Sequence, residues 1–83
     1  MVTPSDIKSW IEAGLPEAVV SVDGDGHHFY ALILFNGFEG KSLIQRHRVV
    51  YDVLGDKMKA DIHALSMKTF TFDEHKQVTG EGL

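Results

Sequence analysis

Residues 38–54, FEGKSLIQRHRVVYDVL, constrain the fold most, because they contain the longest helical pattern in the chain. A serine that can cap a helix precedes the pattern at Ser42, and a glycine suited to closing one follows it at Gly55. The apolar and amphipathic residues recur at helix spacing, so they predict one stripe that faces a core. The stripe consists of Leu43, Ile44, His47, Val50, Tyr51 and Leu54, and the residues predicted to point elsewhere are Gln45, Arg46, Arg48 and Asp52.

The segments around this helix predict two further helices and three strands. An N-terminal helix is expected to start at Thr3 and Pro4 and to end at Gly14. Strands are expected over residues 17–22, 28–35 and 62–71, with a hairpin turn at 23–27. Residues 56–61 suggest a short helical turn. Thr71 and Glu74 have the spacing of a capping box, which predicts a last helix.

The predicted order is helix, strand, strand, helix, strand, helix. The central helix provides the crossover that a parallel pairing of the second and third strands needs. The sequence therefore predicts an α+β fold, with a three-stranded mixed sheet and helices packed on one face. A chain of 83 residues makes one domain, residues 1–83, in which we expect residues 79–83 to form a flexible tail.

Composition narrows the classes of function. The chain has no cysteine, so a metal must be held by histidine, carboxylate or a partner's ligands. The formal net charge of −4 disfavours a dedicated nucleic-acid binder, which needs clustered cations. Neither a spanning apolar run nor a signal peptide is evident, so we expect a cytoplasmic protein without membrane contact. The chain has neither a cysteine nucleophile nor a Ser-His-Asp signature, so we do not expect it to be an enzyme.

The central helix also contains candidates for nucleic-acid contact, namely Lys41, Gln45, Arg46 and Arg48. Residues 37–40 are a literal G-x-x-G, the loop with which KH domains clamp a nucleic-acid backbone. Glu39 places a negative charge there, which favours a simple turn. The same helix can be a solvated face or a protein-docking surface, and exposure of Val49 and Val53 would favour a partner protein over DNA.

Histidine is the other unusual feature, with five in this short chain. His27 and His28 lie at the hairpin turn, and His63 opens the third strand. No local metal spacing such as H-x-x-x-H is present, so the residues alone leave surface and structural histidines as the simpler interpretation.

Three motifs in order resemble the signature of the BolA-like family. They are F-E-G-K-S-L-I-Q-R-H-R-x-V-Y, the preceding G-D-G-H-H-F at residues 24–29, and I-H-A-L-S-M-K-T at residues 62–69. The resemblance extends from about Ile7 to Glu74 and implies a fold similar to type II KH domains. The chain departs from the family at Phe72 and His75, where members commonly have proline and tryptophan.

The resemblance implies an adaptor that pairs with a monothiol glutaredoxin and shares a [2Fe–2S] cluster in iron–sulfur maturation, trafficking or iron regulation. The glutaredoxin supplies a cysteine and a glutathione thiolate, and the family's I-H-A-L-S histidine corresponds to His63. The hairpin supplies the second ligand, for which His27 is the better candidate and His28 its competitor, because His28 matches a strand-start residue. Mixed imidazole and thiolate ligation is known chemistry for such clusters. The isolated domain is then expected to be a monomer without a cofactor.

The resemblance also implies an alternative function. Some BolA-like proteins are transcriptional regulators of cell shape and stress response, and here the KH-like surface around residues 37–48 would contact DNA. The glutaredoxin and DNA would then compete for one surface.

Overall fold

The computed structural model describes residues 1–79. Its elements follow the predicted order: α1 (Pro4–Gly14), β1 (Val19–Gly24), β2 (His28–Leu34), the 3₁₀ turn η1 (Asn36–Phe38), α2 (Leu43–Leu54), α3 (Lys57–Ala60), β3 (Ala64–Phe70) and α4 (Phe72–Thr79). Of the tail expected at residues 79–83, Thr79 belongs to α4, and the rest lies outside the described residues. No helix among residues 1–79 is both long and apolar enough to cross a bilayer.

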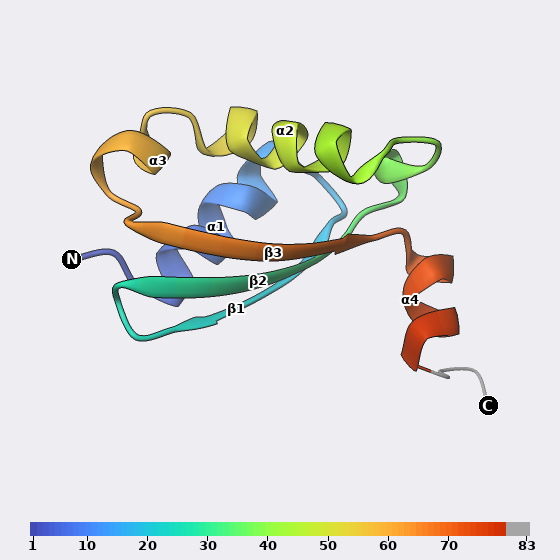
Figure 1. Cartoon of the computed structure of the whole chain (residues 1–83), viewed down its shortest axis with the longest axis horizontal. Coiled ribbons are helices and arrows are strands. Elements are labelled where there is room, and N and C mark those ends of the chain that lie inside the picture. The colour runs from blue at the N-terminus through green and yellow to red at the C-terminus, as the bar shows by residue number, and fades with distance from the viewer. Residues whose placement is uncertain (80–83) are drawn as a thin grey trace.

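The three strands form one mixed sheet in the order β1-β2-β3. β1 pairs antiparallel with β2, and β3 pairs parallel with β2, with His28 opposite Ala64. Helices α1 and α2 lie together over one face of the sheet, and α4 follows at the far end of β3 (Figure 1). The predicted α+β fold with a three-stranded mixed sheet is confirmed.

The core fills the space between this sheet and the two helices. Alternate residues of β2 point into it, because successive side chains of a strand face opposite sides. The largest side chains that are fully buried are Phe29, Phe38, Ile7, Ile11, Ile33, Leu54 and Val50. β2 pairs with both β1 and β3 and contributes Phe29 and Ile33 to this set. It is therefore the central strand of the sheet.

Local signals set the helix ends as predicted. Ser42 caps α2 with Gln45 in a reciprocal capping box, and Thr3 does the same for α1 with Asp6. Gly55 follows α2 with φ of 55°. β1 begins at Val19 instead of residue 17, because Glu17 has φ of 74°, which an extended strand does not allow.

The predicted apolar stripe of α2 is confirmed for Val50 and Leu54 and wrong for Leu43, Ile44 and Tyr51, which are exposed. The face that packs on the sheet consists of Arg46, Val50 and Leu54, whereas Leu43 and Ile44 are 64% and 68% exposed. Val49 and Val53 are half-buried against the core, so they do not form the exposed patch considered above. Arg46 lies on the buried face, where it binds acceptors far along the chain, as described below.

Candidate functional site

His27 lies in the hairpin between β1 and β2, and one carboxylate shapes that hairpin. The backbone N–H groups of His27 and His28 both donate to Oδ1 of Asp25 at 2.9 Å. These bonds favour the charged carboxylate, so the N–H groups of His28 and then His27 lower the pKa of Asp25. Sequence reasoning identified Asp25 only as a turn former. In the structure it orients the backbone that carries His27.

His63 lies just before β3, at the same end of the sheet. Its neighbour Ile62 is buried, and the Ile62 N–H donates to the carbonyl of Lys57 at 2.8 Å. This bond joins residue 62 to the α3 turn, and β3 begins two residues later at Ala64. Because β2 and β3 are parallel and His28 is opposite Ala64, both strands start at one edge. The hairpin and the segment before β3 therefore meet.

The structure brings His27 and His63 together. Their ring centroids are 6.2 Å apart with the rings at 85° to each other, and both residues are exposed. His28, the competing candidate, is the first residue of β2. These two adjacent imidazoles come from separate segments, and we call them the histidine pair.

The donor set of the histidine pair suits iron. Neutral imidazole replaces cysteine on one iron of Rieske-type [2Fe–2S] centres. Within the described part of the chain, no group of three or more His, Cys, Asp or Glu residues is placed to hold a metal ion. A metal centre at the histidine pair would therefore need further ligands from a partner.

The structure removes Arg46 from the candidates for nucleic-acid contact. Arg46 is only 7% exposed, and its Nε donates to the Lys41 carbonyl at 2.9 Å. Nη1 donates to the Thr69 carbonyl at 3.3 Å, and both terminal nitrogens bind the Glu74 carboxylate at 2.6 and 2.9 Å. Sequence reasoning placed Arg46 on the solvent side, because its partner Glu74 showed only a capping-box spacing.

The other three candidates differ in their surroundings. Gln45 uses its Oε1 to accept the Ser42 N–H at 2.9 Å, so its side chain serves the helix cap. Lys41 and Arg48 are exposed. Of the predicted nucleic-acid contacts, these two cations therefore have free access to a phosphate.

Because the Glu74 carboxylate is paired with Arg46, we expect the stability of the fold to decrease at acid pH. Arg46 and then the Thr71 N–H lower the pKa of Glu74 from 4.5 to about 2. Because this pKa is depressed in the folded state, the ionised Glu74 carboxylate stabilises the fold above pH 4.5. That contribution is lost as the pH falls toward 2. We expect Glu74→Gln to be less stable than wild type at pH 6, with the difference shrinking as the pH approaches 2.

Urea unfolding from pH 6 to pH 2 measures this effect. Asp73→Asn is the matched control, because Asp73 is exposed in the same first turn of α4. A wild-type and Glu74→Gln difference that stays constant across this range would contradict the prediction.

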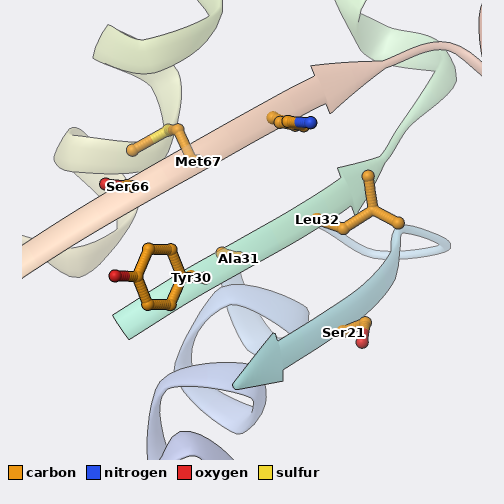
Figure 2. Close-up of a pocket in the computed structure, with 7 residues that line it drawn as sticks. Ser21, Tyr30, Ala31, Leu32, Ser66 and Met67 are labelled. Atoms are coloured by element: carbon orange, nitrogen blue, oxygen red, sulfur yellow. The ribbon is translucent and has the colours of Figure 1, made fainter. Parts of the chain in front are cut away.

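A shallow concavity of about 270 Å³ lies on the sheet, lined by Ser21, Tyr30, Ala31, Leu32, Ser66, Met67 and Lys68. Figure 2 shows Tyr30 and Leu32 on β2 between Ser21 of β1 and Ser66 of β3. Tyr30 is 58% exposed and alternates with the buried Phe29 and Ala31, so it points away from the helices. None of the predicted site residues lines this concavity.

Known proteins resemble this chain in both sequence and fold. A family model described as "BolA-like protein" matches residues 8–74. The structure of a bolA protein homologue from Coxiella burnetii is 57% identical, with a TM-score of 0.86, over 92% of this chain and 99% of that one. The BolA domain of SufE1 from Arabidopsis thaliana is 33% identical, with a TM-score of 0.75, over 86% of this chain and 93% of that one.

Curated relatives are longer than the matched part. The DNA-binding transcriptional regulator BolA of Escherichia coli is 31% identical over 61% of this chain, which covers 49% of that protein. SufE-like protein 1 of Arabidopsis thaliana is 43% identical over 71% of this chain, which covers 16% of that protein. The similarity to these relatives is therefore similarity to part of each.

Proposed function

Because this chain belongs to the BolA-like family, we propose that it is a non-enzymatic adaptor that binds a monothiol glutaredoxin and shares a [2Fe–2S] cluster with it. The observation that supports the proposal is the histidine pair, in which two exposed imidazoles from separate segments lie 6.2 Å apart. The role would be iron–sulfur cluster maturation, trafficking or iron regulation, in the cytoplasm.

In this proposal His63 and His27 each offer a neutral imidazole nitrogen. The glutaredoxin cysteine and the glutathione thiolate would complete the ligand set, since the chain has no cysteine of its own. The shared cluster is the cargo to be passed on or sensed. The domain's own contribution is to fix the spacing of the two rings, through Asp25 on one side and the 57–62 segment on the other.

Anaerobic reconstitution with a monothiol glutaredoxin, glutathione, iron and sulfide tests the proposal. Visible absorption and circular dichroism would compare wild type with His63→Ala, His27→Ala and His28→Ala. We expect a mixed-complex spectrum that is lost in His63→Ala, weakened in His27→Ala and retained in His28→Ala, because only the first two rings face each other. A wild-type spectrum equal to that of glutaredoxin alone would reject the adaptor function.

Nucleic-acid binding is the second candidate. It is favoured by the relatives from Escherichia coli and Vibrio cholerae that are named DNA-binding transcriptional regulators, and by the exposed cations Lys41 and Arg48. Binding to duplex and single-stranded DNA at low salt tests it, because low salt favours even weak phosphate contacts. Lys41→Ala and Arg48→Ala would each weaken such binding, and no binding by wild type would exclude this function.

A further inference from the structure

The helical turn α3 leads into His63, yet it has little stability of its own. It spans only Lys57–Ala60, none of its residues is buried, and the Asp56 side chain makes no capping hydrogen bond. A single helical turn is unstable alone, because nucleation costs more than its few hydrogen bonds return. Contacts with the rest of the domain must therefore hold the segment that leads to His63.

Met58 packs against the core and Ile62 is buried, and Lys57 adds contacts through its side chain and its carbonyl. Its Nζ lies 4.9 Å from the centroid of the Trp10 ring, a cation–π arrangement. Its carbonyl accepts the N–H of Asp61 at 2.9 Å and that of Ile62 at 2.8 Å. One residue thus connects α1 to the residue that directly precedes His63.

The other end of this connection lies on a packed helix. Trp10 belongs to α1, whose Ile7 and Ile11 are fully buried. The indole is half-buried and packs against the core, so the core supports the ring that the Lys57 ammonium contacts. His27 is held differently, through Asp25, so separate anchors set the positions of the two rings.

We propose that Lys57 is a positioning residue for His63, with Trp10 as its platform. The inference rests on the adaptor function proposed above and adds a determinant of ligand geometry outside the histidine pair. Lys57 acts through the backbone of Asp61 and Ile62 and donates nothing to the metal.

Three variants at exposed or half-buried positions test this inference. Lys57→Met keeps most of the apolar stem and removes the ammonium, and Lys57→Arg restores a cation over the indole. Lys59→Met is the matched control, because it removes the same charge from an exposed position of the same turn. The chain has one tryptophan, so its emission reports the Lys57 contact directly.

We expect Lys57→Met to change the Trp10 emission and to speed amide exchange at Ile62 about two- to fivefold, the factor that an exposed cation–π contact provides. With limiting glutaredoxin, the visible circular dichroism of the mixed complex should fall by up to the same factor. Lys57→Arg and Lys59→Met should behave like wild type in all three measurements.

Two results would overturn the inference. One is an Ile62 exchange rate that Lys57→Met leaves unchanged. The other is faster exchange without any loss of the mixed-complex signal, because the anchor would then not serve His63. A mixed complex that survives His63→Ala would reject His63 as a ligand, and a wild-type spectrum equal to that of glutaredoxin alone would reject the adaptor function. In both cases exchange in the isolated domain would still report the anchoring of Ile62.

Discussion

Arg46→Met is expected to cost about 2–3 kcal/mol of unfolding free energy, because it removes a buried guanidinium from backbone acceptors and from a Glu74 side chain that is 40% exposed. The substitution keeps an apolar stem but removes the Arg46 donor from the carbonyls of Lys41 and Thr69, and it leaves the Glu74 carboxylate with only the Thr71 N–H. A domain of this size has roughly 4–12 kcal/mol of stability, so the loss would be a large part of it.

Urea unfolding followed by the Trp10 emission measures this cost. Arg48→Met is the matched control, because Arg48 is exposed on the same helix, and we expect it to change stability by less than about 0.5 kcal/mol. The double variant Arg46→Met/Glu74→Gln should lose less than the sum of the single changes, because the two side chains share one interaction. An Arg46→Met variant within about 1 kcal/mol of wild type would contradict a central structural role.

Gly24→Ala is expected to cost about 2–5 kcal/mol, from backbone strain and steric overlap together. Gly24 has φ of 156°, and a Cβ there would lie 2.3 Å from the backbone oxygen of His28. The clash cannot be relieved by a side chain alone, because Gly24 is paired with Phe29 across the hairpin. The hairpin must shift, and His27 with it.

Gly40→Ala provides the control for strain without overlap. Gly40 has φ of 78°, but no atom lies within 4 Å of the position that a Cβ would take, so we expect a cost of about 1–2 kcal/mol. Denaturant unfolding gives both costs, and nuclear Overhauser contacts between the His27 and His63 rings show whether the hairpin moved. Equal costs for the two variants, with the ring contacts retained, would refute the steric argument.

The difference between sequence and structure is clearest in α2. Its ends were predictable from Ser42 and Gly55, because capping depends on residues close in sequence. Its orientation was not, since hydrophobic periodicity favoured Leu43 and Ile44 as buried residues. The buried face instead includes Arg46, whose acceptor Glu74 lies 28 residues away.

The candidate site shows the same division. The resemblance selected His63 and preferred His27 over His28 before any geometry was known. The contact between the two rings depends on the parallel register of β2 and β3, and the anchors Asp25 and Lys57 gave no sequence signal beyond turn and helix formation.

The sequence by itself determined the order of the elements, the helix caps and the mixed sheet, because these follow from local propensities and short-range spacing. Only the tertiary structure decided which face of α2 is buried and which two imidazoles meet. Both outcomes depend on hydrogen bonds and strand register between segments that are distant in sequence. These segments come into contact only when the sheet and helices pack.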